Sequence, residues 1–332
     1  MDESYSLTVS TDGNVDIEAE SSVGLAHGLT TFTQLFYLHS NGGYYTRLAP
    51  VVIRDAPKFP HRGLNLDISR HFIPISDIKR TIDALAYNKF NRLHLHATDS
   101  QSWPLEIPSM PDLAEKGAYQ PDMTYSASDV ADLQYYGLSR GVQVYVEVDV
   151  PGHTSSIWYS RPELVVAYGQ QGWDNFAAQP PSGTLKLNST DVYDFMDELY
   201  DDLLPRLNNY SSYFHSGGDE INKNAYELDE TVGSSSVDVL RPLLQKFADK
   251  IHDQIREYGM TPIVWEEMLL EWELDLGEDV VVQTWRSDEA VLRTVEAGHK
   301  ALVGNYDNWV SKMLSLPMGG SVVSNLANLH HC

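Results

Sequence analysis

The chain has 332 residues, 42% of them hydrophobic, which is enough for one large domain and a smaller one. Its 47 acidic and 23 basic residues give a net charge of -24. A field of this sign repels phosphate backbones and anionic lipids, which argues against nucleic-acid and membrane-surface partners. The one cysteine, Cys332, leaves no pair for a disulfide within the chain, and no apolar run is long enough to span a membrane.

The first 57 residues predict a small unit of strands and one helix. Residues 6–10 and 15–19 alternate apolar and polar side chains, as half-buried strands do. Residues 24–38 have apolar side chains at helical spacing, and residues 50–54 return as a strand. We expect this segment, residues 1–57, to be the remainder of a small α/β domain.

The sequence pattern changes in residues 58–309, where apolar strand-like runs alternate with helical patterns. Ile78, Ile82 and Leu85 mark the buried face of one helix, and Ser76 and Asp191 are the expected N-caps of two. This alternation predicts a parallel sheet, and the length favours a (β/α)8 TIM barrel over an open doubly wound sheet. The seven strand-like runs are residues 63–69, 92–99, 143–150, 212–220, 262–268, 280–285 and 300–306.

The pattern stops after Trp309. Residues 310–332 contain no Asp or Glu, although acids are frequent elsewhere, and no strand–helix unit is recognisable there. We therefore expect an aberrant tail and a barrel that lacks its last strand. Such a sheet would leave an unpaired edge beside its first strand and an open wall in its core. On this basis we expect the chain alone to be unstable or weakly active.

Polar and aromatic side chains follow almost every predicted strand. In a barrel the carboxyl ends of the strands meet at one mouth, so these side chains should converge on one site. The most informative ending is Gly217-Gly218-Asp219-Glu220, because two adjacent buried acids raise each other's pKa and are costly to hold. The other endings include Asp67, Arg70, His71, His94, His96, Asp99, Glu147, Asp149, His153, Trp265, Glu266, Glu267, Trp285 and Arg286.

This set of side chains favours a neutral polar ligand such as a sugar. Indole rings stack on the C–H face of a pyranose, and charged groups bind its hydroxyls. His94 and His96 fall on one strand face, so a metal pair is an alternative, although the closely spaced His/Cys set of a zinc site is not found. The sequence also lacks a Gly-x-Ser-x-Gly elbow, which argues against a serine hydrolase.

The ending His215-Ser-Gly-Gly-Asp219-Glu220 matches the His-x-Gly-Gly-Asp-Glu signature of β-N-acetylhexosaminidases, glycoside hydrolase family 20. The chain resembles this family, in its eukaryotic, fungal branch, over residues 22–309. The family continues with a Tyr-Leu-Asp-Cys-Gly segment that this sequence lacks, so we give no role to Tyr306, Asp307 or Trp309. The other segments that carry the resemblance are residues 59–63, 67–72, 86–91, 94–96, 102–106, 151–154 and 265–267.

The resemblance implies roles for the two adjacent acids. In this family the substrate's own 2-acetamido oxygen attacks the anomeric carbon, so no protein nucleophile is needed. Glu220 would be the general acid and then the base, with a pKa raised toward the working pH by burial and by Asp219. Asp219 would hold the acetamido N–H and stabilise the oxazolinium-like intermediate.

Five further residues would bind or position the sugar. Arg70 matches the arginine that binds the O3 and O4 hydroxyls, and a structural salt bridge is the alternative role for it. Asp99 and His153 match a pair that orients the acid. Trp265 and Trp285 match walls around the acetamido methyl group and the sugar face.

These features predict a retaining hydrolase that removes terminal N-acetylglucosamine or N-acetylgalactosamine from chitin fragments or glycoconjugates. A non-catalytic sugar-binding fragment is the alternative that follows from an incomplete barrel. The family implies no metal and no cofactor. Homodimers are frequent among its full-length members, and loss of the last strands could remove the dimer contact. Sequons at Asn188 and Asn209 favour a secreted or vacuolar/lysosomal glycoprotein, although residues 1–5 show no signal peptide.

Overall fold

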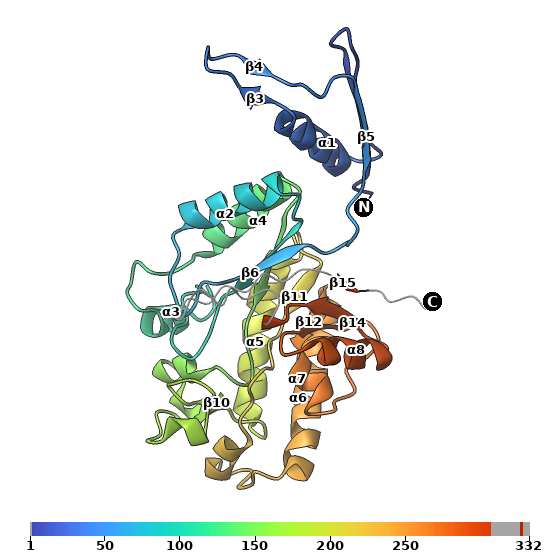
Figure 1. Ribbon diagram of the computed structural model, residues 1–332. Helices are drawn as coiled ribbons and strands as arrows, with labels where there is room; N and C mark the ends of the chain where they lie inside the picture. The colour runs from blue at the N-terminus through green and yellow to red at the C-terminus, as the bar shows by residue number, and fades with distance from the viewer. Residues whose placement is uncertain (1, 307–325, 328–332) are drawn as a thin grey trace.

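The computed structural model describes residues 2–306, 326 and 327. Figure 1 shows two parts, a small N-terminal unit and a larger part built around a parallel sheet, joined by the segment between β5 and β6. No helix in the described part of the chain is long and apolar enough to cross a membrane. The expected domain limits at residues 57 and 309 remain predictions.

The N-terminal unit is a three-stranded antiparallel sheet with one helix against it. β1 (Tyr5–Val9) lies between β2 (Val15–Glu18) and β5 (Val51–Asp55), as the alternating pattern predicted. α1 (Ser22–Gln34) begins at Ser21, whose hydroxyl accepts a hydrogen bond from the Gly24 N–H at 3.0 Å. The helix was expected to continue to residue 38, which is wrong. The chain instead forms a hairpin, in which β3 (Tyr37–Leu38) pairs with β4 (Tyr44–Tyr45).

The larger part contains a sheet of seven parallel strands, each of which overlaps one predicted run. Neighbouring strands pair in chain order without a reversal, as in a barrel and unlike a doubly wound sheet, which has a switch point. The sheet curls with helices around it and forms an incomplete (β/α)8 barrel, so the predicted fold is confirmed. The strands are β6 (Gly63–Asp67), β7 (Arg92–His96), β8 (Gln143–Glu147), β11 (Tyr213–His215), β12 (Thr261–Trp265), β13 (Val281–Thr284) and β14 (Lys300–Val303).

One strand of this sheet was not expected. β15 (Leu326–Ala327) comes from the predicted aberrant tail and pairs antiparallel with β14. Within the described residues, β15 and β6 are the two edges of the sheet and no strand joins them. The rest of the predicted tail lies outside the described residues. In the part that the structure describes, β6 therefore keeps the unpaired edge that the sequence predicted.

Helices and short loop elements surround the strands. Ile78, Ile82 and Leu85 are buried, as their spacing predicted. Both predicted N-caps are wrong, because the helices begin earlier and their N-caps are Pro74 and Ser189. The α-helices are α2 (Ile75–Tyr87), α3 (Asp112–Gly117), α4 (Ala127–Leu138), α5 (Thr190–Leu207), α6 (Val237–Glu257), α7 (Glu266–Leu270) and α8 (Asp288–Glu296). The loops contain four short 3-10 helices, η1 (Ser155–Tyr159), η2 (Pro162–Leu164), η3 (Trp173–Asn175) and η4 (Lys223–Leu228). They also contain the two paired strands β9 (Val165–Val166) and β10 (Thr184–Leu185).

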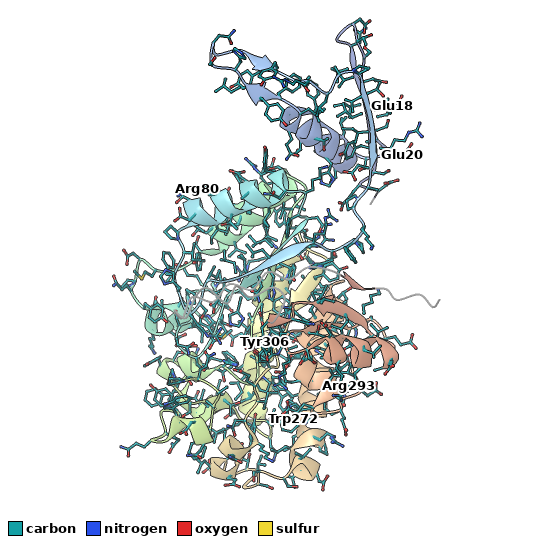
Figure 2. The ribbon with its side chains drawn as sticks, in the orientation of Figure 1. Glu18, Glu20, Arg80, Trp272, Arg293 and Tyr306 are labelled. Atoms are coloured by element: carbon teal, nitrogen blue, oxygen red, sulfur yellow. The ribbon has the colours of Figure 1, made fainter. Side chains whose placement is uncertain are left out.

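Lys89, just after α2, links the two parts. Its ammonium group donates to Tyr5 Oη at 2.8 Å, to Thr31 Oγ1 at 2.7 Å and to Asp55 Oδ2 at 3.0 Å. Figure 2 labels Glu18 on the N-terminal unit and Trp272 in the larger part. One lysine from the barrel thus satisfies polar groups on β1, α1 and β5 at once.

We expect Lys89→Met to loosen the N-terminal unit, because three hydrogen bonds across the junction are lost. Each such bond contributes about 1 kcal/mol, so amide hydrogen exchange in β1 and β5 should become about tenfold faster or more. Lys300→Met, an exposed lysine with no ion pair among the described residues, is the matched control and should leave that exchange unchanged. Equal exchange in the two variants would contradict this role for Lys89.

Candidate active site

The two adjacent acids follow β11 through a turn that requires glycine. Gly217 and Gly218 have φ angles of +71° and +99°, a region that other residues rarely adopt. A Cβ atom on Gly217 would lie 1.8 Å from Asp149 Oδ1, and the Gly218 N–H donates to the same oxygen at 2.9 Å. The turn therefore packs directly against Asp149 and is hydrogen-bonded to it. This turn places Asp219 and Glu220 at the carboxyl end of the sheet.

A row of alternating charges leads away from Glu220. Glu220 Oε2 lies 3.2 Å from His153 Nε2, and His153 Nδ1 lies 3.2 Å from Asp99 Oδ1. One terminal nitrogen of Arg70 lies 2.7 Å from Asp99 Oδ2, and the other lies 2.8 Å from Asp67 Oδ2. The structure thus brings together predicted site residues that follow four different strands. The salt bridge considered as the alternative role for Arg70 is present, and Asp99 is a second partner.

Burial disfavours the charged forms of His153 and Asp99, but the oppositely charged groups next to them have the larger effect on their pKa values. Burial acts to lower the pKa of His153, yet Asp99, Asp219 and Asp149 hold that pKa well above its usual range. Burial acts to raise the pKa of Asp99, yet His153 and Arg70 hold it below the usual range. At neutral pH His153 is therefore an imidazolium that lies between carboxylates.

Glu220 differs from the expectation. We expected its pKa to be raised, but in this structure it is lowered. Burial raises the pKa of Glu220, and the contact with the positively charged His153 outweighs that effect. The side chain is still 23% exposed, so its desolvation is incomplete. The prediction was wrong because the distance between Glu220 and His153, 3.2 Å in the structure, cannot be derived from their positions in the sequence.

Asp219 behaves in the opposite way to Glu220. Burial raises its pKa, and the charges of Glu147 and Glu220 add to this, while His153 offsets only part of it. Its Oδ1 atom is buried and has no hydrogen-bond partner among the described residues. A buried carboxylate oxygen without a partner is unfavourable. The side chain as a whole is 18% exposed, so a ligand N–H can reach the carboxylate from its exposed part.

One buried carboxylate lies beneath the mouth and contacts four side chains. Glu147 accepts a hydrogen bond from Trp265 Nε1 at 2.7 Å and lies 2.7 Å from His94 Nε2. It also lies 2.8 Å from His96 Nδ1 and 3.3 Å from His215 Nδ1. Burial acts to raise the pKa of Glu147, but these histidines keep it well below its usual range. The sequence placed Glu147 at a strand end and gave it no role, because its partners lie on three other strands.

The two tryptophans are held by their indole nitrogens. Trp265 is buried, and its ring centroid lies 5.0 Å from that of His215. Trp285 Nε1 donates to the carboxylate of Glu267 at 3.1 Å and 3.2 Å. Burial and the charge of Asp219 raise the pKa of Glu267 to about 8. Each ring is therefore fixed in one orientation, as the wall of a binding site requires.

The histidines considered as a metal pair do not stand apart from this network. His94 and His96 both contact Glu147, so their ring nitrogens face a carboxylate. Several groups of ligating atoms do lie within 4.8 Å of one another, and these groups are His94–Glu147–His215, His96–Glu147–Asp149, Asp99–Asp149–His153 and His153–Asp219–Glu220. Buried carboxylates and imidazoles that neutralise one another form such groups without an ion.

A curled parallel sheet whose carboxyl ends hold paired acids, an arginine and indoles is typical of barrel proteins of the glycosidase class. The model of the glycosyl hydrolase family 20 catalytic domain matches residues 59–313, and that of a domain described as beta-acetyl hexosaminidase like matches residues 1–35. The chain belongs to glycoside hydrolase family 20, which confirms the family that the motifs predicted.

Relatives and solved structures agree with this assignment. The chain is 47% identical to a beta-hexosaminidase of Arthroderma benhamiae, over 98% of this chain and 56% of that protein. It is 31% identical to a chitooligosaccharidolytic beta-N-acetylglucosaminidase of Bombyx mori, over 92% of this chain and 55% of that protein. The chitobiase of Flavobacterium johnsoniae matches with a TM-score of 0.79 and 30% identity, over 92% of this chain and 46% of that one. The chain thus spans about half the length of these relatives.

We expect Gly217→Ala to disrupt the acid pair, because its Cβ would overlap Asp149 Oδ1 at 1.8 Å. The new methyl group must displace the Asp149 side chain, and a positive φ adds about 1 kcal/mol of strain. The total loss of unfolding free energy should be about 3 kcal/mol or more. Urea unfolding measures it. Gly13→Ala is the control, since Gly13 has a φ of +86° and nothing lies within 4 Å of its Cβ position. Similar losses in both variants would show that the overlap does not matter.

Proposed function

We propose that this chain hydrolyses terminal, non-reducing N-acetyl-β-D-hexosaminides with retention of configuration. The observation that carries the proposal is the pair at the end of β11. Glu220 lies 3.2 Å from a protonated His153, and Asp219 beside it has a buried oxygen without a partner. One residue can supply a proton while its neighbour accepts an N–H, which is the division of work that substrate-assisted cleavage needs.

Glu220 is the proposed general acid and base. A general acid must hold a proton when the glycosidic oxygen departs, and the lowered pKa of Glu220 means that it holds none at neutral pH. His153 supplies the missing proton, since its Nε2 faces Glu220 Oε2 and its pKa is raised. Asp99, on the other ring nitrogen, stabilises the imidazolium before the transfer.

Asp219 is the proposed partner of the substrate's acetamido group. Its carboxylate, which is 18% exposed at the side chain, would accept the acetamido N–H, and this contact would orient the carbonyl oxygen toward the anomeric carbon. Its charge would stabilise the oxazolinium-like intermediate as positive charge develops. This role requires the ionised carboxylate, which the raised pKa of Asp219 disfavours in the free chain. An N–H donor and a cationic intermediate would both favour the ionised form once a substrate is bound.

The proposed sugar contacts come from the remaining predicted residues. Arg70 is 30% exposed at its side chain, so it can reach vicinal hydroxyls while it stays paired with Asp99. Trp265 and Trp285 would form the walls of the pocket. A cavity of about 530 Å³ has Glu220 in its lining and would offer room for the leaving group. Its lining includes Glu220, Asn222, Lys223, Asn224, Trp272 (Figure 2) and Arg286.

Short chitin fragments are the proposed substrates. The name of the Bombyx mori relative describes cleavage of chitooligosaccharides, and polar side chains line the cavity beside Glu220. Asn188 and Asn209, the two sequon residues, are both exposed, so glycan attachment is sterically possible and a secreted glycoprotein is part of the proposal.

A sugar-binding fragment without turnover is the second candidate, and the open sheet favours it. Within the described residues β6 has no partner on one side, so part of the pocket wall is not formed by them. Hydrolysis of a nitrophenyl N-acetylglucosaminide by the full chain separates the two candidates. Proton NMR of the first product should show the β-anomer. An α-anomer would rule out retention, and binding without hydrolysis would establish the second candidate.

We expect Glu220→Gln to lower kcat for N,N′-diacetylchitobiose by about 10²- to 10⁴-fold, because the leaving sugar then receives no proton. The Kd for N-acetylglucosamine, measured by calorimetry, should change by about twofold at most, since Gln keeps the shape and hydrogen-bonding capacity of the side chain. Glu278→Gln, an exposed glutamate outside the site, is the control and should keep normal turnover. Normal turnover by the Glu220 variant would refute the assignment.

We expect His153→Gln to move the alkaline limb of the kcat/KM profile to lower pH. In the native pair a proton stays bound until the raised pKa of His153 is passed. In the variant Glu220 alone must hold the proton, and a carboxyl group loses it at lower pH. His39→Gln, an exposed histidine of the N-terminal unit, should leave the profile unchanged. An alkaline limb that stays in place or moves to higher pH would show that the pair does not share the proton.

A further inference from the structure

A second cavity, of about 530 Å³, lies at the opposite end of the barrel from Glu220. We call it the basal cavity, and its wall combines the N-terminal segment, the link between β5 and β6, and the amino ends of three strands. Arg92, Gln143 and Tyr213 are the first residues of β7, β8 and β11, whereas the acid pair follows the carboxyl end of β11. The remaining lining residues used below are Asp2, Glu3, Lys58, His61 and Arg62.

Two arginines line the basal cavity, and only one of them is satisfied. Arg62 donates to the carbonyl oxygens of Lys89 and Phe59, both at 2.7 Å, and forms an ion pair with Glu3. Arg92 makes a single hydrogen bond within the described part of the chain, from Nη1 to the Asn91 carbonyl oxygen at 2.8 Å. The buried Nε atom of Arg92 has no partner there, and no carboxylate of the described residues lies within ion-pair distance.

This lack of a partner is unusual for the chain. The other arginines without a carboxylate partner in the described part, Arg47, Arg54 and Arg293, are all exposed to solvent, where water satisfies them. Arg92 is largely removed from water, and its guanidinium lies 5.8 Å from the ring centroid of Tyr213. Burial lowers the pKa of Arg92, and no acid within ion-pair distance restores it. A half-buried cation of this kind is stabilised when an anion binds beside it.

His61 adds a second buried donor to the same wall. It is 2% exposed, and its Nε2 atom has no hydrogen-bond partner among the described residues. Burial keeps its pKa well below the usual range, with the charge of Arg92 as the next cause, so the ring is neutral. A neutral imidazole can present an N–H at Nε2 and donate it to an oxygen atom in the cavity.

The balance of charge in the basal cavity is the reverse of that of the whole chain. Its lining has three cations, Lys58, Arg62 and Arg92, against two acids, Asp2 and Glu3. Glu3 is already neutralised by Arg62, which leaves the two other cations and one acid. In a chain with a net charge of -24 this is a local positive site.

We propose that the basal cavity binds a small oxyanion, of the phosphate or carboxylate class. Arg92 makes the principal contact, His61 Nε2 donates a hydrogen bond, and Lys58 contributes charge at the rim. Because the wall includes residues of both parts of the molecule, the bound anion also holds the N-terminal segment against the amino ends of the barrel strands. The site does not depend on the proposed hydrolytic activity, since it uses none of the residues at the mouth.

Calorimetric titration of the full chain tests the proposal, with inorganic phosphate and sodium acetate as the two probes. Sodium chloride keeps the ionic strength constant, so that general screening does not change. Saturable binding of phosphate, of acetate or of both is expected, and the comparison decides which class of anion the site prefers. The same anion should raise the midpoint of thermal unfolding, because it binds the folded state.

Variants decide whether Arg92 is responsible. We expect Arg92→Gln to weaken binding at least about tenfold, because a charge-assisted hydrogen bond contributes about that factor to affinity. Arg54→Gln is the control. Arg54 is an exposed arginine outside the cavity that also lacks a carboxylate partner among the described residues, so this variant should keep the native Kd. Lys58→Gln, at the exposed rim, should weaken binding about threefold. This variant takes the place of Arg92→Gln in the test if Arg92→Gln does not fold. The proposal is overturned if neither anion binds saturably above the chloride reference, or if the cavity variants bind as tightly as Arg54→Gln.

Discussion

Buried carboxylates at the carboxyl end of the sheet remain charged only where a cation lies next to them. His153 stands between Asp99 and Glu220, and His96, the one of the three histidines around Glu147 whose pKa is raised, lies 2.8 Å from Glu147. Without these neighbours, burial would leave each acid neutral or would exclude it from the barrel. This requirement explains why histidines and acids alternate on adjacent strands.

The same requirement makes neighbouring acids unequal. Glu220 contacts the imidazolium directly and has a lowered pKa, while Asp219 is more deeply buried, with a partnerless oxygen, and has a raised one. Two residues next to each other in the chain thus have different chemistry, because His153 lies 3.2 Å from Glu220 but 3.9 Å from Asp219, and the charges of Glu147 and Glu220 act on Asp219 as well. Such a split is what lets adjacent carboxylates take the separate roles proposed for them. The opposite end of the barrel shows the converse case, in which a cation, Arg92, is buried without an acid.

Much of the fold could be predicted from the sequence because its signals are local. The apolar runs and their spacing located all seven parallel strands, and glycines beside Asp219 marked the turn. Helix starts were less predictable, since Pro74 and Ser189 act as N-caps in place of the residues chosen from composition. The pairing of β15 with β14 could not be predicted either, because a two-residue strand has no pattern of its own.

What the sequence determined by itself was the order of strands and helices, the family, and the set of residues at the strand ends. These follow from periodicity and from motifs within a few residues of one another. What only the tertiary structure decided was the direction of each pKa shift, the role of Glu147 as a common partner, and the unpaired state of Arg92. These depend on distances between side chains that lie far apart in the sequence. Trp265 and Glu147, for example, are separated by 118 positions. Electrostatic energy varies with distance in space and with burial, and a sequence specifies neither until the chain has folded.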